Sequence, residues 1–221
     1  MERIPEPELM DDEAQALAYA RADFEIPHNQ FIERFQSQWP SADINGSVID
    51  LGCGPADISV RFARAYPHCT VLGVDGAKAM LAHGLTRIQE EGLQEQITLE
   101  HRLLPDAALP SRCFQTVISN SLLHHLHQPQ ILWQTINQCA AQGAQVFVMD
   151  LMRPESEAIA EQMMNDYVTG EPEILQHDFY HSLLAAFTLD EVSAQLQQAG
   201  LAGLEVKAIS DRHLLVAGRI S

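Results

Sequence analysis

The stretch that decides the fold is Val48-Ile-Asp-Leu-Gly-Cys-Gly-Pro-Ala56. In it a β-branched apolar run ends in two glycines, and a pattern with Ile58 and Phe62 on one helical face follows. This order predicts a buried strand over 47–51, a glycine loop, and a helix over 56–66. Glycines let the backbone approach a ligand closely, and the first turn of a helix offers unpaired N–H groups. We therefore expect a ligand site at the carboxyl end of this strand.

The alternation of strand and helix continues along the chain. Further strands are expected at 70–74, 97–99, 115–119 and 145–150, and helices at 78–91 and 129–141. Elements that alternate at this spacing predict βαβ units and a mostly parallel sheet. The last two expected strands, 204–209 and 213–217, are joined by a short turn at Ser210-Asp211, so they form an antiparallel hairpin. The sequence therefore predicts an α/β fold that carries one antiparallel pair.

Two helical regions lie outside this alternation. Residues 10–40 have the pattern of N-terminal helices, with a helix start at Pro27, and residues 155–187 are helical in composition without a strand. After them, Thr188-Leu-Asp-Glu191 is a capping box that opens a helix ended by Gly200. We expect both regions to cover the strand ends and to exclude water from a site there. The polar residues of the insertion expected to contact a second ligand are Tyr167, His177, Tyr180 and His181.

Length and composition indicate a single domain over 1–221. Apolar residues make up 46% and charged residues 19%, values typical of soluble globular proteins. The 30 acidic and 13 basic side chains give a formal net charge of −17, which disfavours nucleic acid and anionic membranes as partners. An acidic, proline-broken start and the absence of a long apolar run predict a cytoplasmic protein without signal peptide or membrane span. The 4 cysteines form no Cys-x-x-Cys pair, which predicts a reducing compartment and no structural zinc site.

Acidic residues around the glycine loop distinguish two classes of ligand. A dinucleotide fingerprint needs a third glycine where Asp57 stands, and a carboxylate there would repel a pyrophosphate. Asp50, two residues before the first glycine, suits a cationic ligand. Asp75 ends the second strand, where a carboxylate can accept hydrogen bonds from both hydroxyls of a ribose. S-adenosylmethionine, which carries a sulfonium and an ammonium, fits this loop better than a pyrophosphate does.

Three motifs carry a resemblance to a known family: D-L-G-C-G-P-A at 50–56, G-V-D-G at 73–76 and F-Q-T-V-I-S-N-S-L-L-H-H-L at 114–126. Together they resemble the class I S-adenosylmethionine-dependent methyltransferases, and most of all the small-molecule branch that includes the quinone-biosynthesis enzymes. The resemblance covers about 31–217. It implies a doubly wound, Rossmann-like sheet of seven strands in the order 3-2-1-4-5-7-6, with strand seven antiparallel. It also implies methyl transfer to a small-molecule acceptor, with S-adenosylhomocysteine as product.

The resemblance assigns cofactor contacts residue by residue. The methionine part is expected beside the glycine loop, the ribose at the end of the second strand, and the adenine after the third strand. Ala56 stands where the family has its third loop glycine, a small departure. The expected cofactor-binding residues are Asp50, Gly52, Cys53, Gly54, Asp75, Gly76, Met80, Asp106 and Asn120. The register of Asp106 is open by about two positions, and Leu103 or Leu104 can supply backbone contacts instead.

Histidines follow the fourth strand, where a doubly wound sheet places its active site. His125 is our candidate for a base or an orienting group for the acceptor, with Asp150 as the carboxylate that orients its ring. Arg153 is expected to hold an anionic acceptor. His124 is the alternative to His125, because a shift of one position in the helix start would exchange them. His124, His125 and His127 together suggest a metal, but consecutive residues on a helix point about 100° apart and three rings cannot all converge, so we expect no metal.

Two other functions stay open from the sequence. One is a nucleotide-cofactor oxidoreductase of the NAD type on a similar sheet, and the other is a non-catalytic, methyltransferase-like binding protein. Methyltransferases that act on the amino groups of nucleobases carry an Asn/Asp-Pro-Pro-aromatic element after strand four. The corresponding Ser119-Asn-Ser-Leu122 lacks prolines, which argues with the charge against a nucleic acid substrate.

Overall fold

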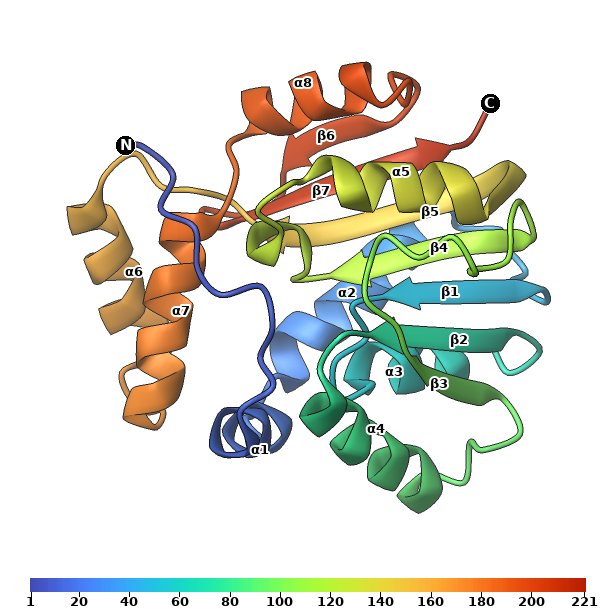
Figure 1. The fold of residues 1–221 in the computed structure, drawn as a ribbon, viewed down its shortest axis with the longest axis horizontal. Coiled ribbons are helices and arrows are strands. Elements are labelled where there is room, and N and C mark those ends of the chain that lie inside the picture. Colours follow the sequence, from blue (N-terminus) through green and yellow to red (C-terminus); the bar gives the residue numbers. More distant parts are fainter.

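A seven-stranded sheet organises the computed structural model, which describes residues 1–221 (Figure 1). The strands lie in the order β3-β2-β1-β4-β5-β7-β6, and β7 runs antiparallel to both of its neighbours while the other pairings are parallel. This confirms the fold predicted from the sequence. The strands are β1 Ser47–Leu51, β2 Thr70–Asp75, β3 Ile97–His101, β4 Phe114–Asn120, β5 Ala140–Leu151, β6 Glu205–Ala208 and β7 His213–Arg219.

Helices connect the strands and extend the chain at the strand ends. The capping box predicted at Thr188 forms, with both reciprocal hydrogen bonds to Glu191. The helix expected to start at Pro27 begins earlier, at Glu25, because a proline is tolerated within the first turn, where N–H groups have no partner. The helices are α1 Glu13–Arg21, α2 Glu25–Gln38, α3 Asp57–Ala65, α4 Lys78–Glu90, the 3₁₀ turn η1 Leu123–His125, α5 Gln130–Cys139, α6 Glu157–Val168, α7 Glu173–Ala185 and α8 Leu189–Gln198.

The core lies in two layers, one on each face of the sheet. Helices α5 and α8 lie on one face of the sheet and α2 and α3 on the other (Figure 1), and their apolar side chains form the two layers. Strand β5 supplies both layers because its side chains alternate: Val146 and Val148 face α5, while Phe147 faces α2. On that second face Phe147 lies edge-on to Phe31 and Phe35, with ring centroids 4.9 and 5.4 Å apart. Burial on both faces fixes the strand register and therefore the positions of the strand ends.

Several segments gather at the edge of the sheet where the parallel strands end. Figure 1 shows α1, α6 and α7 beyond the arrowheads of β1, β4 and β5, with the first residues of the chain passing between them. A small apolar cluster that includes Leu151, Ala160 and Leu183 packs α6 and α7 onto the end of β5. None of the helices combines the length and the apolar character needed to cross a membrane.

Candidate functional site

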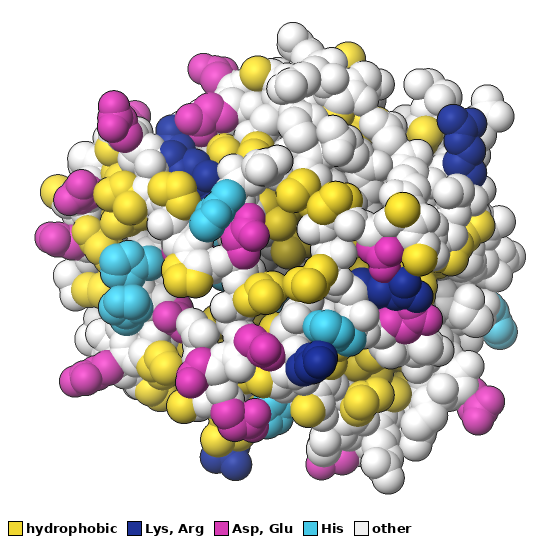
Figure 2. Space-filling model, in the orientation of Figure 1, with side chains coloured by type: hydrophobic (Ala, Val, Ile, Leu, Met, Phe, Trp, Pro, Cys, Tyr) yellow, Lys and Arg dark blue, Asp and Glu magenta, His cyan; other side chains and the backbone are white.

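A cavity of about 860 Å³ opens at the carboxyl ends of β1, β2 and β4. Its wall combines the glycine loop, the β2 end, the β4 end, the first residues of the chain, the α1–α2 region and one side of α6 and α7. Figure 2 shows this face of the molecule, where acidic side chains and histidines are interspersed with apolar ones. A parallel α/β sheet places its ligand in this position, so the cavity is the candidate site.

The glycine loop is shaped by backbone conformations that favour glycine. Gly52 and Gly54 have φ values of 71° and 51°, in the left-handed region. A Cβ added to Gly52 would lie 2.8 Å from the Leu122 side chain, whereas one added to Gly54 would meet nothing within 4 Å. Gly54 therefore borders open space in the cavity wall. Ala56 continues the loop with a φ of 61°, so it fills the third glycine position with the smallest side chain that has a Cβ.

Asp75 connects the second strand to the glycine loop. One carboxylate oxygen accepts from the Gly54 N–H at 2.8 Å, and the other accepts from the Ala77 N–H at 2.7 Å. Burial raises the pKa of Asp75 despite these two hydrogen bonds. Each oxygen keeps a lone pair for another donor, and the residue lines the cavity. The paired hydroxyls of a ribose match this remaining capacity.

Asp50 is almost fully buried at the end of β1 and also lines the cavity. Its single side-chain partner is the Ser59 hydroxyl, which donates to it at 2.5 Å. Burial raises the pKa of Asp50 to about 7, more than the Ser59 hydrogen bond lowers it. A buried carboxylate with so little compensation is stabilised by a cation placed beside it.

The residues that follow β3 differ from those predicted to contact the adenine. Asp106, expected at an adenine amino group, does not line the cavity, because Arg102 and the Ala108 N–H hold its carboxylate outside, each at 2.8 Å. Arg102, Leu103 and Leu104 line the wall instead, which corresponds to the open register stated above. The apolar wall is completed by Gly76 and Met80, both placed as expected.

The histidine arrangement differs from the prediction in one respect. Asp150 pairs with His124, Nδ1 to Oδ1 at 2.6 Å, and not with His125. The reason is the 3₁₀ turn after β4, whose Leu123 N–H donates to the same carboxylate at 2.7 Å and brings the His124 ring to Asp150. Burial opposes charge on His124, yet Asp150 raises its pKa. Burial and the neighbouring His124 lower the pKa of His125 to about 3, so His125 is too weak a base at neutral pH for the role expected of it.

The rings of His124 and His125 lie together, with centroids 4.2 Å apart and a tilt of 37°, whereas His127 Nε2 meets the carbonyl oxygen of Glu6 at 2.8 Å. The expectation for Arg153 is wrong. Arg153 does not reach the cavity: its guanidinium donates to Glu191 at 2.7 Å and to the carbonyl of Ala186 at 3.1 Å. The Arg153 side chain therefore fixes the start of α8 instead of holding an acceptor.

The first residues of the chain form a wall of the site that the sequence did not predict. We call residues 1–12 the N-terminal strap. It begins beside the start of α6 and the end of α7, passes η1 and reaches the start of α4. Its Leu9 side chain lies against Gly76. Four side chains hold it: Arg3 donates to the carbonyls of His124 and Ala185 at 2.8 and 2.5 Å, Glu6 accepts from Ser182 at 3.0 Å, Glu8 from the His127 N–H at 2.8 Å and Asp11 from the Ala79 N–H at 3.0 Å.

The helical insertion faces the cavity with residues other than those expected. Tyr167 lines the cavity as predicted, but His177, Tyr180 and His181 do not. The 3.6-residue period of α7 turns a different stripe inward, consisting of Leu175, Asp178, Phe179 and Ser182. Tyr167 is positioned by its hydroxyl, which donates to Asp211 at 2.5 Å.

Asp57 ties three helices together beside the glycine loop. Its carboxylate accepts from His28 of α2 at 2.5 Å, and from Arg61 of α3 and Arg87 of α4 at 2.7 Å each. Burial alone would raise the pKa of Asp57, but the hydrogen bonds from His28 and Arg61 lower it well below its usual value. Asp57, whose carboxylate departs from the dinucleotide-binding motif, therefore stabilises the packing of the three helices.

Replacing Asp57 by alanine is expected to lower the free energy of unfolding by about 3 kcal/mol, because two guanidinium groups lose their buried partner. Urea unfolding at neutral pH measures this as a lower midpoint with an unchanged slope. The contribution is present above the ordinary pKa of 3.8 and is lost as the pH falls through the depressed value in the folded protein. Asp106→Ala, which removes a partly buried carboxylate paired with a single arginine, is the control, and an equal loss in both variants would contradict the role of Asp57.

Comparison with known proteins places these residues in a family context. Residues 48–143 match the family model described as a methyltransferase domain. An uncharacterized methyltransferase of Mycobacterium tuberculosis is 28% identical over 107 residues, which cover 48% of this chain and 51% of that relative. The chain thus spans about half the length of the curated relatives that it matches first.

Solved methyltransferase structures superpose on most of the chain. An S-adenosylmethionine-dependent methyltransferase from Aquifex aeolicus superposes with a TM-score of 0.68 at 14% identity, covering 95% of this chain and 99% of the other. The phosphoethanolamine N-methyltransferase 2 of Haemonchus contortus, solved with phosphomonomethylethanolamine and S-adenosylhomocysteine, superposes with a TM-score of 0.71 at 15% identity, covering 94% of this chain and 57% of the other. The solved structures confirm the fold that the resemblance implies.

Proposed function

We propose that this chain, which has the fold of the class I S-adenosylmethionine-dependent methyltransferases and a methyltransferase domain at 48–143, binds S-adenosylmethionine in the cavity and transfers its methyl group to a small-molecule acceptor. The observation that carries the proposal is the juxtaposition of two carboxylates, the buried Asp50 and the half-buried Asp75, on either side of an open glycine loop. One suits a cationic amino acid part and the other a ribose.

The residues fit this cofactor part by part. Asp50 is a poorly compensated buried carboxyl that a sulfonium or an ammonium would stabilise. Asp75 has free lone pairs for the ribose hydroxyls, and Met80, Leu103 and Leu104 offer an apolar surface to a purine ring. Asn120 lines the same cavity, and its buried side-chain oxygen has no partner within the chain, so it is available to a donor on the cofactor. Cys53 lines the wall beside the loop.

The chemistry asks the protein mainly for alignment. A sulfonium methyl is already activated toward nucleophiles, so holding the acceptor in line with it supplies most of the rate enhancement. The N-terminal strap and the inward stripe of α7 close the side of the cavity opposite the glycine loop, and this closure excludes water. The polar groups there, Tyr167, Asp178 and Ser182, are our revised candidates for contacts to the acceptor.

A small-molecule acceptor is supported by the enclosure of the site and by the charge of the chain. Hydrogen bonds at Glu6, Glu8 and Asp11 hold the strap along the cavity, and this enclosure favours a small acceptor over a polymer. A formal net charge of −17 repels nucleic acid. A single domain at 1–221, a cytoplasmic location and a relation to the quinone-biosynthesis branch remain predictions from the sequence.

Titration calorimetry of the purified chain with S-adenosylmethionine, S-adenosylhomocysteine and NAD tests the proposal. We expect saturable one-to-one binding of the first two and no binding of NAD. Tight NAD binding would favour the oxidoreductase and overturn the proposal. Incubation with isotopically labelled cofactor and a metabolite extract, followed by mass spectrometry, then identifies the acceptor, whereas binding without any labelled product would favour a non-catalytic protein.

A further inference from the structure

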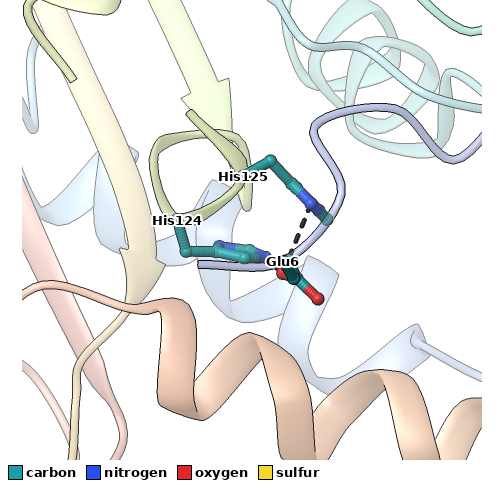
Figure 3. Close-up of side chains that lie close together, drawn as sticks. All are labelled: Glu6, His124 and His125. Atoms are coloured by element: carbon teal, nitrogen blue, oxygen red, sulfur yellow. Dashed lines mark ion pairs between the residues drawn. The ribbon is translucent and has the colours of Figure 1, made fainter. Parts of the chain in front are cut away.

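Three potential ligand atoms converge where the N-terminal strap passes η1. They belong to Glu6, His124 and His125, and they all lie within 4.8 Å of one another. Glu6 Oε1 is 3.6 Å from His124 Nε2 and 3.3 Å from His125 Nδ1. Figure 3 shows the carboxylate of the strap approaching both rings, which come from consecutive residues of the turn.

The hydrogen bonds around these atoms show which of them face one another. His124 uses Nδ1 for Asp150, at 2.6 Å, so the Nε2 atom is the one that faces Glu6. His125 Nδ1 is buried and has no hydrogen-bond partner. Glu6 Oε1 accepts only from the Ser182 hydroxyl, at 3.0 Å, so a carboxylate oxygen and two imidazole nitrogens meet with a single neutral donor among them, an arrangement that a cation would stabilise.

We propose that Glu6, His124 and His125 bind one divalent transition-metal ion, of which zinc is the best match. Bonds of about 2.0–2.2 Å at tetrahedral angles place zinc ligands roughly 3.3–3.5 Å apart, close to the separations from Glu6 to both histidines. Two nitrogens and one carboxylate oxygen are a ligand set that zinc accepts. The carboxylate–histidine pair of Asp150 and His124 supplies the outer support that metal-binding histidines usually have.

The position of the site gives the metal a role in the proposed reaction, and this role rests on the proposed function. His124 and His125 both line the cavity, so the fourth coordination position faces it. An acceptor with a hydroxyl or thiol can occupy that position, release its proton to solvent and present the resulting anion as the nucleophile. The metal would also join the strap to η1, because Glu6 belongs to the first and the histidines to the second.

Metal binding can be measured without any methyl transfer. The chain is treated with a chelator, dialysed and titrated with Zn²⁺ by calorimetry, and with Co²⁺ by absorption spectroscopy, which reports the coordination geometry. We expect one ion per chain and a four-coordinate Co²⁺ spectrum. Glu6→Gln and His125→Gln should each weaken Zn²⁺ binding at least 10-fold, and Asp150→Asn should weaken it about 10-fold to 100-fold through His124.

The matched control is the exposed histidine pair on α7, His177 and His181, whose ring centroids are also 4.2 Å apart. His177→Gln should leave the Zn²⁺ affinity and the Co²⁺ spectrum unchanged. Loss of binding in His177→Gln but not in Glu6→Gln would overturn the proposal, as would absence of binding in the wild-type chain, which would mean that a proton occupies the cluster instead. Thermal unfolding identifies any variant that fails to fold. If a variant does not fold, the Co²⁺ spectrum of the wild-type chain alone decides whether the metal site exists.

These outcomes are separable from those of the proposed function. Binding of S-adenosylmethionine depends on Asp50, Gly54 and Asp75, none of which belongs to the metal cluster. A chain that binds the cofactor but no metal retains the proposed function and loses this inference. A chain that binds the metal but no cofactor keeps the metal site and loses the proposed function.

Discussion

Asp75→Ala is expected to weaken S-adenosylmethionine binding by about 10²–10⁴-fold. Two ribose hydroxyls would lose a charged acceptor, each hydrogen bond being worth about 1.5–3 kcal/mol. The variant also frees the Gly54 and Ala77 N–H groups that Asp75 holds, so the glycine loop loses its tie to β2. Calorimetry on folded protein, checked by thermal unfolding, measures the effect.

Asp106→Ala is the matched control for that experiment. Asp106 was the other acidic residue assigned to the nucleoside part, and the structure places it outside the cavity. Its replacement should leave the cofactor affinity unchanged. Unchanged affinity in Asp75→Ala, or an equal loss in both variants, would show that the ribose does not lie at the end of β2.

Asp50→Asn is expected to make the ligand-free protein more stable and its cofactor binding weaker. Burial raises the pKa of Asp50 from an ordinary value of 3.8 to about 7, so the folded chain retains a proton that the unfolded chain releases. Stability from this group is fully present below about pH 4 and is lost as the pH rises toward 7, by about 4 kcal/mol in total. Asparagine cannot ionise, and its amide oxygen can still accept from Ser59.

Thermal unfolding between pH 5 and pH 9 should therefore show a falling wild-type stability that Asp50→Asn does not share. Cofactor affinity of the wild type should rise as the pH approaches 7, because a cationic ligand favours the ionised carboxylate. Calorimetry in two buffers of different ionisation enthalpy would detect a proton released on binding below pH 7. Parallel pH profiles for wild type and Asp50→Asn would contradict the assignment of Asp50 to the cationic part.

The fold was predictable because each local signal agrees with its neighbours. Runs of β-branched residues around Ile49 and Val71 alternate with amphipathic helices, which requires parallel strands and right-handed crossovers. The hairpin at 205–219 follows from a turn too short for any other pairing. The strand order itself came from the family resemblance, because no local signal states which strands are neighbours.

The cofactor half of the candidate site was predictable for a similar reason. Asp50, Gly52, Gly54 and Asp75 lie within or next to strand ends, and the sheet brings parallel strand ends together. The assignment of Asp106 to the adenine failed because this residue lies in a loop, where no periodicity fixes which side chain points inward. The register of that loop is set instead by Arg102, whose backbone N–H donates to the carbonyl of Asp75 at 2.9 Å.

The acceptor half depended on contacts between segments far apart in the chain. Glu6 and His125 are in contact although more than a hundred residues separate them in the sequence. No sequence pattern in the strap predicts that it closes the cavity. The choice of His124 over His125 as the partner of Asp150 follows from one 3₁₀ turn, which no periodic pattern in the sequence specifies.

The sequence by itself determined the sheet, the glycine loop and the two carboxylates beside it, because periodic burial and short connections leave those backbone positions little freedom. Only the tertiary structure decided which polar side chains face the cavity from the strap, η1 and α7. Such orientations depend on packing between elements: Ser182 faces the cavity and His181 does not because α7 is rotated to bury Leu183 and Leu184 against α6 and β5.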